Sequence, residues 1–283
     1  MIILKKAKDL LEHLNHCRQK GQSIGFVPTM GALHDGHISL LKTSINENPV
    51  TVCSIFVNPA QFNDLNDFKK YPSTLEEDIF KLETNGCDLL FLPNAEEIYP
   101  DGFDKKNQYA LGYLETILEG EFRPGHFQGV CLAVNKLLQI VQPDKLYLGQ
   151  KDYQQCMIIA RLIQIKGLQE KIETRICPIL REPDGLAMSS RNMRLNKVQR
   201  ALAPAIYQTL LFLKENIGKE SLANLKKEAA TLLIQKGFKP DYVEIADAET
   251  LKPVMEWDTS KKILALTAAY IDQVRLIDNI ALN

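Results

Sequence analysis

The chain has 283 residues, a hydrophobic fraction of 45% and a formal net charge of −1 at pH 7. This length fits one large α/β domain and a smaller one. The composition is typical of globular proteins and excludes disordered and fibrous classes. A charge so close to zero disfavours nucleic acid as a partner, and no apolar run reaches the ~18 residues that a membrane helix needs. We therefore expect a cytoplasmic protein with neither a nucleic-acid nor a membrane partner.

The first part of the chain predicts a parallel sheet. The opening residues suggest a short strand and an amphipathic helix, and from Ser23 onward β-rich runs alternate with helical patterns. The expected strands are "SIGFVP", "VTVCSIFV", "CDLLFLP" and "KLYLG", and the expected helices begin near His37, Ser73, His126 and Asp152. This alternation is typical of βαβ units, and strands that are apolar on both faces indicate a sheet covered by helices on both sides.

The helix near His126 can be checked by its spacing, because its apolar residues recur every three or four positions. They are Phe127, Val130, Cys131, Val134, Leu137, Leu138 and Val141. This spacing predicts one buried face, and Pro143 marks the end of the helix. In the helix near Ser73, Pro72 marks the start and Asn85-Gly86 the end.

The last third of the chain has a different pattern. Two helical stretches, 197–216 and 220–236, precede the β-rich runs "DYVEIADAETL", "KKILALTAAYI" and "QVRLIDNIAL". We expect a Rossmann-like α/β domain with a parallel sheet over residues 1–176 and a smaller α+β lid domain over residues 177–283. The boundary follows from Pro178, Pro183 and Gly185, which punctuate a connecting segment.

The six cysteines are widely scattered, without a C-x-x-C pair or a nearby histidine at zinc-finger spacing. Most of them lie inside apolar runs. We therefore expect buried, reduced thiols, and neither disulfides nor metal ligands.

Ligands of open parallel sheets bind where the carboxyl ends of strands lead into helices. The stretch "PTMGALHDGH" follows the first central strand, and Gly31 and Gly36 would let its backbone approach an anion at the next helix N-terminus. His34 and His37 could hydrogen-bond phosphoryl oxygens there. An isolated H-x-x-H pair fits ordinary helix capping equally well, so the pattern leaves both interpretations open. Zinc is disfavoured because no third ligand is evident nearby.

Three further polar clusters lie at comparable places, namely "NPAQFN", "EGEFRPGHF" and "GQKDYQQ". In "FVNPAQF", Asn58 and Gln61 could recognise hydroxyls and carboxylates, although amides alone are more often turn formers. In "GQKDYQQ", Gln155 is similar and Lys151 suits a phosphate, whereas Asp152 alone is better explained as a helix cap. A lone Lys-Asp pair is usually a solvated surface pair.

The stretch "MSSRN" supplies Ser189, Ser190 and Arg191, which could clamp the outer phosphates of a nucleotide. The string alone is a weak signal, because Ser-Ser-Arg is common in loops. The sequence lacks G-x-x-x-x-G-K-[ST], so a P-loop is excluded. Triphosphate binding would have to be assembled from separate loops.

In combination, these motifs resemble one family. The stretches "PTMGALHDGH", "SIFVNPAQF", "YPSTLEED", "EGEFRPGHFQGV", "LYLGQKDYQQ" and "DGLAMSSRN" occur in the order found in pantothenate synthetases. The match runs from about Gly25 to Asn192 and continues toward the C-terminus. "HDGH" resembles the H-x-G-H signature of the adenylyl-transferring superfamily that includes class I aminoacyl-tRNA synthetases, and "MSSRN" resembles the position of its mobile K-M-S-K-S loop.

The resemblance implies an AMP-forming acid–amine ligase. Such an enzyme condenses (R)-pantoate with β-alanine to pantothenate through a pantoyl adenylate, releasing pyrophosphate and AMP. It implies ATP as co-substrate, Mg²⁺ with the nucleotide, and a homodimer. The metal ligands stay unassigned. Catalytic roles fall on His37, His34 and Lys151.

By the same resemblance, ATP is bound by residues of four segments. They are Met30, Gly31, Ala32, Leu33, His34, Asp35, Gly36, His37, Gly149, Gln150, Lys151, Asp152, Leu180, Met188, Ser189, Ser190 and Arg191. Gln61 and Gln155 match the glutamines that hold pantoate, with Gln61 also close to β-alanine. Asn58 and Arg123 match further substrate-pocket residues, as do Tyr71 and Glu119 with less defined roles. Some relatives carry Glu at the position of Gln150, where an amide could still meet a ribose hydroxyl.

The chemistry agrees with this assignment. A carboxylate that attacks an anionic α-phosphorus needs positioning and charge neutralisation, and no covalent enzyme nucleophile. The adenylate is prone to hydrolysis, so the second step needs a closed site, which a small domain hinged near Cys177 could provide.

Three other functions fit the sequence less well than this ligase. A nucleotidylyltransferase should carry extra basic residues for its phosphate substrate, where this chain has Asn58 and Gln61. A tRNA synthetase fragment is disfavoured by the neutral charge and the lack of an anticodon-binding extension. A nucleotide-sensing module need not keep both Gln61 and Gln155.

Overall fold

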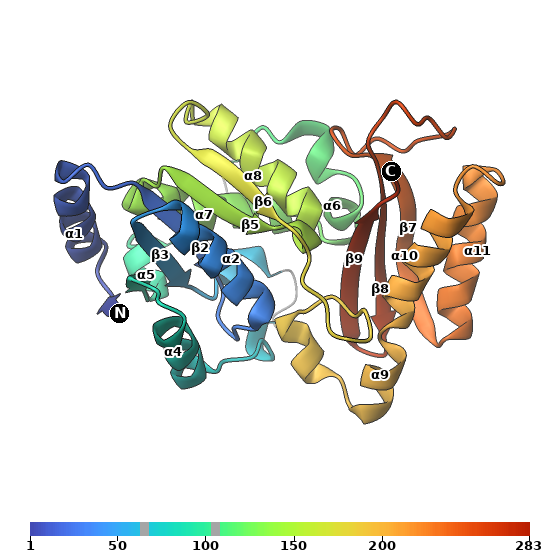
Figure 1. Ribbon diagram of the computed structural model, residues 1–283, viewed down its shortest axis with the longest axis horizontal. Helices are drawn as coiled ribbons and strands as arrows, with labels where there is room; N and C mark the ends of the chain where they lie inside the picture. Colours follow the sequence, from blue (N-terminus) through green and yellow to red (C-terminus); the bar gives the residue numbers. More distant parts are fainter. Residues whose placement is uncertain (63–67, 103–107) are drawn as a thin grey trace. The chain divides into compact units, whose positions relative to one another are not determined.

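The computed structural model describes residues 1–62, 68–102 and 108–283. The chain forms two compact units (Figure 1). The larger consists of Met1–Gly149 and Gln155–Pro178, and the smaller of Gln150–Gln154 and Ile179–Asn283. The sequence-based boundary after residue 176 lies two residues before the end of the larger unit. The structure also assigns the segment Gln150–Gln154 to the smaller unit.

The described part of the larger unit contains a six-stranded parallel sheet in the order β1-β4-β3-β2-β5-β6. The strands are β1 (Ile2–Leu4), β2 (Ile24–Thr29), β3 (Val50–Ile55), β4 (Leu89–Phe91), β5 (Lys145–Gly149) and β6 (Glu173–Cys177). The predicted parallel sheet is confirmed. The chain passes from β2 outward to β4 and then returns to the other side of β2, so the strand order switches between β2 and β5. Ligands of such sheets bind beside this switch point.

The strands expected from the sequence did not include β6, whose residues are "ETRIC". In the structure β6 pairs with β5 and forms the edge of the sheet, with Glu173, Arg175 and Ile176 exposed. An edge strand lacks the apolar run of a central strand because it has few neighbours to bury it.

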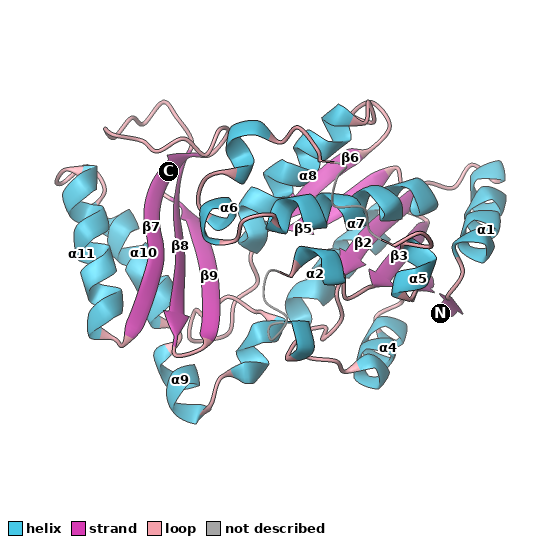
Figure 2. Cartoon of the chain, turned by 180° about the vertical axis from the view of Figure 1, so that it is seen from behind, coloured by secondary structure: helices cyan, strands magenta, loops and turns pink. Residues whose placement is uncertain are grey.

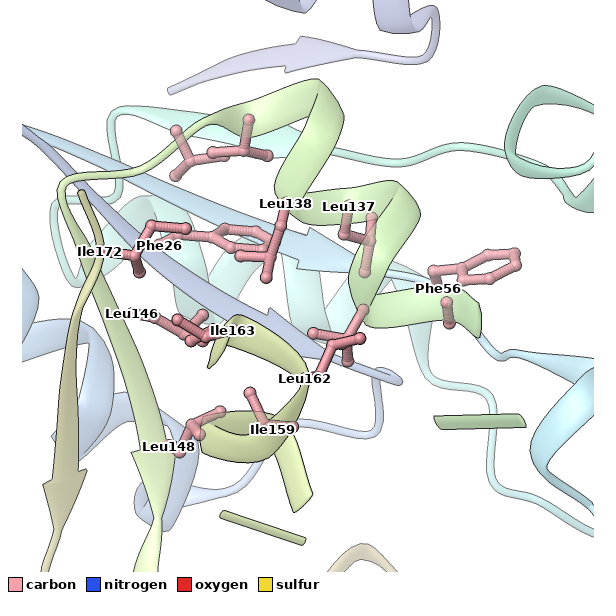
Figure 3. Close-up of a cluster of buried hydrophobic side chains, with 14 of the residues drawn as sticks. Phe26, Phe56, Leu137, Leu138, Leu146, Leu148, Ile159, Leu162, Ile163 and Ile172 are labelled. Atoms are coloured by element: carbon pink, nitrogen blue, oxygen red, sulfur yellow. The ribbon is translucent and has the colours of Figure 1, made fainter. Parts of the chain in front are cut away.

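Helices cover both faces of this sheet, as expected. They are α1 (Ala7–Gln19), α2 (Asp35–Glu47), α4 (Leu75–Thr84), α5 (Ala95–Ile98), α6 (Glu119–Phe122), α7 (His126–Val141) and α8 (Tyr153–Ile165). One core cluster joins the sheet to α1, α7 and α8, and Figure 3 shows Leu137 and Leu138 of α7 near Phe26 of β2. A second cluster joins the opposite face to α2 and α4, with Leu41 and Leu82 among its members.

The predicted helix starts are close to those observed. Helix α7 begins at His126, and all seven residues of its predicted apolar face are buried. Helix α2 begins two residues before His37, and α4 begins two residues after Ser73. Asn85 is the C-cap of α4, and Gly86 follows it with φ +81°, the left-handed conformation that favours glycine.

The smaller unit contains a three-stranded antiparallel sheet, and each of its strands overlaps one of the three β-rich runs seen in the sequence. Its strands are β7 (Phe238–Asp247), β8 (Ile263–Ile271) and β9 (Val274–Ala281), and its helices are α9 (Lys197–Leu202), α10 (Ala205–Asn216) and α11 (Leu222–Gln235). Helices α10 and α11 pack beside this sheet (Figure 2). The single helical stretch expected over 197–216 is wrong, because it is two helices that separate at Ala203 and Pro204. Proline lacks the N–H that a continuous helix requires.

All six cysteines are free and buried. Burial raises the pKa of the Cys131 thiol to about 12, so this thiol is protonated at neutral pH. Among the residues described, none of the helices is both long and apolar enough to cross a bilayer. The same residues contain no group of three or more His, Cys, Asp or Glu side chains suited to a metal ion.

Candidate active site

The HDGH loop connects β2 to α2 in the larger unit. Gly31 and Ala32 both have left-handed backbones, with φ +81° and +49°. The chain then becomes extended at His34, the N-cap of α2, which begins at Asp35. Left-handed conformations are unfavourable for residues with a Cβ, so contacts elsewhere must hold Ala32 in place.

His34 and His37 cap the first turn of α2 reciprocally. His34 Nδ1 accepts a hydrogen bond from Gly36 N–H at 3.2 Å, and His37 Nδ1 accepts one from His34 N–H at 3.3 Å. Their ring centroids are 4.0 Å apart. When Nδ1 is the acceptor, a neutral ring carries its proton on Nε2, an atom that can donate to a phosphoryl oxygen. The capping interpretation is therefore confirmed, and phosphate binding by the two rings stays a prediction.

Helix α4 holds the HDGH loop through Asp78 and Lys81. The Asp78 carboxylate accepts the N–H of Ala32 at 2.8 Å and the N–H of Leu33 at 2.7 Å, and it is only 1% exposed. Lys81 Nζ donates to the carbonyl of Leu33 at 2.7 Å. Charge-assisted hydrogen bonds of this kind are the strong ones. They stabilise the left-handed turn in front of the histidines.

Gly31 lets the carboxylate approach. A Cβ at this position would lie 3.1 Å from Asp78 Oδ2 and 3.1 Å from Ile55 Cγ2. The sequence analysis expected glycine to admit a ligand to the backbone here. The close approach that the structure shows is to Asp78 of α4.

The NPAQ turn follows β3, and Asn58 organises it. Asn58 Oδ1 accepts hydrogen bonds from Ala60 N–H and the Tyr99 hydroxyl, and its Nδ2 donates to the carbonyl of Gly129 and to Gln61 Oε1. Asn58 is thus buried and engaged with protein groups on all sides. Its predicted contact with substrate stays a prediction, and its observed contacts fix the position of Gln61.

Gln61 joins this turn to the HDGH loop and to α7. Its Nε2 lies 2.8 Å from Met30 Sδ, and its backbone carbonyl lies 2.8 Å from His126 Nδ1 at the start of α7. The structure therefore brings a residue predicted for pantoate next to one predicted for ATP. Gly129 packs so tightly on this turn that a Cβ there would overlap the Ala60 carbonyl.

The larger unit also contains the other residues that were predicted to line the substrate pocket. Arg123 pairs with Glu119, the buried first residue of α6, at 3.5 Å between Nη1 and Oε2. Tyr71 packs edge-on against Phe62, with 5.8 Å between ring centroids. Gln155 is half-buried on α8.

In the smaller unit, Asn279 of β9 holds the GQKD segment. Its Nδ2 donates to the carbonyls of Gln150 and Lys151, each at 3.0 Å, and its Oδ1 accepts from Gln150 Nε2 at 3.2 Å. Lys151 Nζ lies 3.5 Å from Asp152 Oδ2. The ammonium group thus has a carboxylate neighbour from its own segment.

The second segment of the smaller unit that is predicted to bind ATP is a turn after Met188. Met188 N–H donates to the Leu180 carbonyl at 3.0 Å, and an isolated bridge pairs Arg181 with Ala187. Ser189 Oγ accepts the N–H of Arg191 at 3.3 Å and caps the 3₁₀ turn Ser190–Arg194. Ser189 therefore caps the turn that contains Arg191.

Comparison with known proteins identifies the family. The family model described as pantoate-beta-alanine ligase matches residues 2–281. The chain belongs to this family. A pantothenate synthetase of Bacteroides thetaiotaomicron is 44% identical over 281 residues, covering 99% of this chain and 98% of that protein. One of Cytophaga hutchinsonii is 45% identical over 285 residues, covering 100% and 99%.

Solved structures of family members share the fold. The pantothenate synthetase of Thermus thermophilus matches with a TM-score of 0.91 and 39% identity, covering 100% of this chain and 99% of that one. The pantoate-beta-alanine ligase of Francisella tularensis, in complex with beta-gamma ATP and beta-alanine, matches with 0.83 and 39%, covering 100% and 98%. The predictions of the family, the fold class and an ATP-dependent ligase that forms pantothenate are confirmed.

The sequence analysis did not single out two buried residues that hold these segments by hydrogen bonds, Asp78 and Asn279. Asp78 ends the quoted stretch "YPSTLEED" and shares the buried face of α4 with Leu82, one helical turn away. An acidic residue on the apolar face of a helix is a detectable signal of a buried polar partner. Asn279 lies in the β-rich run "RLIDNIAL", where a polar residue between apolar ones is a comparable signal.

Proposed function

We propose that this enzyme joins pantoate to β-alanine through a pantoyl adenylate formed on ATP. A pantoate carboxylate oxygen attacks the α-phosphorus, a new O–P bond forms, and the bond from that phosphorus to pyrophosphate breaks. The β-alanine nitrogen, as a free amine, then attacks the pantoyl carbonyl carbon. The C–O bond to phosphate breaks, AMP leaves with that oxygen, and the nitrogen releases a proton to the medium.

The observation that carries this proposal is the arrangement of His34 and His37 at the start of α2. The N-terminal N–H groups of a helix attract anions, and two imidazoles beside them add donors for developing phosphoryl charge. The helix start follows the central strand β2, beside the point where the strand order switches. This is where nucleotides bind in parallel α/β sheets.

The remaining residues are assigned by the chemistry of their side chains. Lys151 and Arg191 neutralise phosphate charge, and Ser189 and Ser190 donate hydroxyl hydrogen bonds. The amides of Gln61 and Gln155 hold pantoate, because an uncharged donor and acceptor can bind a hydroxyl and a carboxylate without attracting a further phosphate. Arg123 approaches substrate with its charge partly offset by Glu119.

Mg²⁺ would accompany ATP. This ion usually keeps several waters and binds through substrate phosphates together with one or two carboxylates. It therefore needs no dedicated cluster of protein ligands, and none of three or more was found among the described residues. When bound, the ion would neutralise charge on the phosphates that leave as pyrophosphate.

The enzyme is further proposed to act as a homodimer in the cytoplasm. The dimer follows from the family resemblance, and six free, buried thiols suit a reducing compartment. Light scattering of the purified protein tests the dimer, since a mass near 32.0 kDa would indicate a monomer instead.

A half-reaction assay tests the assignment of residues. The protein is incubated with ATP, Mg²⁺ and pantoate to measure pyrophosphate release, and β-alanine is added afterwards to measure pantothenate and AMP. We expect His34→Ala and His37→Ala to slow the first step. His16→Ala, which removes an exposed histidine near the end of α1, should leave it unchanged. Normal pyrophosphate release by both site variants would limit the histidines to capping α2.

A further inference from the structure

Strand β9 carries two adjacent polar residues, Asp278 and Asn279, that are each only 2% exposed. Burial of a carboxylate and an amide costs free energy unless each finds hydrogen-bond partners. Asn279 contacts a segment to which an ATP-binding role is proposed, and Asp278 contacts Arg181, in the stretch that leads to a second such segment.

Asn279 faces the segment that carries Lys151. Its Nδ2 donates to two consecutive carbonyls, those of Gln150 and Lys151, and its Oδ1 accepts from the Gln150 side chain. A single amide thus holds the two peptide groups on either side of Lys151. This sets the direction in which the lysine side chain leaves the backbone.

Asp278 faces the segment that leads to Arg191. Its two carboxylate oxygens accept from Arg181 Nη1 and Nη2 at 2.6 and 3.0 Å, a bidentate pair. The Arg181 guanidinium also donates to the carbonyls of Gly185 and Asn279 and lies over the Tyr207 ring, 3.9 Å from its centroid. Arg181 is therefore anchored on every side.

Anchoring of Arg181 fixes the turn that follows it. Arg181 and Ala187 form an isolated antiparallel bridge. Their neighbours Leu180 and Met188 are joined by a backbone hydrogen bond of 3.0 Å. The segment Met188–Arg191 leaves directly from this bridge. Its position in the smaller unit thus depends on the ion pair with Asp278.

We propose that Asp278 and Asn279 are positioning residues that lock the two ATP-binding segments of the smaller unit, 150–152 and 188–191, into one preorganised group. The proposal rests on the proposed function, which assigns both segments to ATP. Charge-stabilising donors act in catalysis when they are already in place as charge develops, and a displacement of ~1 Å can cost ~100-fold in rate. Two adjacent β9 residues give both segments one common support.

The first test separates positioning from general stability. Asn279→Ala removes the contacts to residues 150 and 151, and Asn279→Asp keeps the side-chain size while placing an oxygen against two carbonyls. We expect both to slow adenylate formation by ~10-fold to ~100-fold, with little change in the KM for pantoate. The matched control is Asp241→Asn, which breaks the mostly buried ion pair of Asp241 with Arg275 at 2.7 Å, in the same sheet.

The second test asks whether each positioning residue acts through its segment. In the double variant of Asn279→Ala with Lys151→Ala, the loss should be no larger than that of Lys151→Ala alone. Asp278→Asn should combine in the same non-additive way with Arg191→Ala. Arg181→Lys serves if Asp278→Asn fails to fold, because it keeps a cation and loses the bidentate geometry.

The outcomes distinguish the two proposals. If Lys151→Ala and Arg191→Ala form adenylate at the normal rate, the proposed ATP site is wrong, and the positioning role falls with it. If those variants are slow while Asn279→Ala and Asp278→Asn match the Asp241→Asn control, only the positioning role is overturned. Fully additive losses in both double variants would overturn it as well.

Discussion

The Asp78 carboxylate accepts a hydrogen bond from the backbone N–H of Leu33 at 2.7 Å, across 45 residues of sequence. The contact joins helix α4 to the loop that leads into His34, the N-cap of α2, and His37 in its first turn. It explains how the chain keeps Ala32 in a left-handed conformation directly before the two histidines. The geometry of the turn that is proposed to bind phosphate thus depends on a residue of another helix.

Replacement of Asp78 by Asn tests this dependence. An amide offers one acceptor oxygen to two backbone donors, so one N–H loses its partner inside the protein. We expect a loss of about 1–3 kcal/mol in the free energy of unfolding. We also expect adenylate formation to slow by ~10-fold or more, because the histidines move from their preorganised positions. Denaturant unfolding and pyrophosphate release measure the two effects.

Asp144→Asn is the matched control for that variant. The Asp144 carboxylate accepts the N–H of Ile24 at 2.7 Å, at the opposite end of the strand that leads to the HDGH loop. We expect this variant to lose stability without slowing adenylate formation. Equal slowing of both variants would mean that Asp78 acts through the stability of the sheet alone.

His37 and Lys151 should each contribute strongly to the first half-reaction. Removal of one preorganised charge-stabilising donor typically costs ~100-fold or more in rate. His37→Ala and Lys151→Ala are therefore expected to lose at least that much in adenylate formation. Lys226→Ala is the control for the lysine, because Lys226 of the smaller unit is also paired with a carboxylate, Glu244, at 2.7 Å. Near-normal rates in the two site variants would reduce His37 to a helix cap and Lys151 to a surface ion pair.

Gly129→Ala should affect pantoate more than ATP. The new Cβ would overlap the Ala60 carbonyl and push α7 away from the turn that carries Gln61. Overpacking of this kind costs about 1–3 kcal/mol of stability. We expect the KM for pantoate to rise by ~10-fold, the effect of losing about 1.4 kcal/mol of binding, while the KM for ATP changes much less. Steady-state kinetics with each substrate varied in turn measures this ratio, and a parallel rise of both values would contradict the assignment of Gln61 to pantoate.

Glu97 provides a prediction about pH. Its carboxylate accepts the N–H of Ala7 and the Lys6 ammonium, each at 2.9 Å, and these contacts lower its pKa below the ordinary 4.5. A carboxyl with a lowered pKa in the folded state stabilises that state above its unfolded pKa, and this contribution is lost as the pH falls through the folded value. Glu97→Gln should thus be less stable than the unmodified protein at pH 7, and this difference should shrink as the pH falls through the pKa of Glu97 in the folded state. Urea unfolding over a series of pH values from neutral to acid measures the difference, and a gap that stays constant in acid would contradict the linkage.

Sequence patterns predicted those elements whose burial is visible in the order of residues. Helix α7 shows its buried face in the spacing of Phe127 to Val141, and the strands β2 and β3 consist mostly of apolar residues. Strand β6 was not predicted, because an edge strand with Glu173 and Arg175 exposed has no such pattern. The break at Pro204 was readable and was overlooked in a stretch that is otherwise strongly helical.

The motifs of the candidate site could be predicted from the sequence, whereas the distant residues that hold those motifs in place could not. Spacing showed that His34 and His37 start a helix after a strand, which is a local relationship. The contacts of Asp78 with Leu33 and of Asn279 with Lys151 span 45 and 128 residues, and no local pattern reports which backbone groups a buried side chain will meet. Such contacts become visible only when the fold brings the segments together.

The path of one oxygen atom tests the central claim most directly. Pantoate labelled with ¹⁸O in its carboxylate is converted with ATP, Mg²⁺ and β-alanine, and the products are examined by mass spectrometry. A pantoyl adenylate passes one labelled oxygen to AMP, because the bond that forms to the α-phosphorus survives when the C–O bond breaks. We predict labelled AMP with unlabelled pyrophosphate. Label in inorganic phosphate, accompanied by ADP, would show attack on the γ-phosphorus and contradict the account.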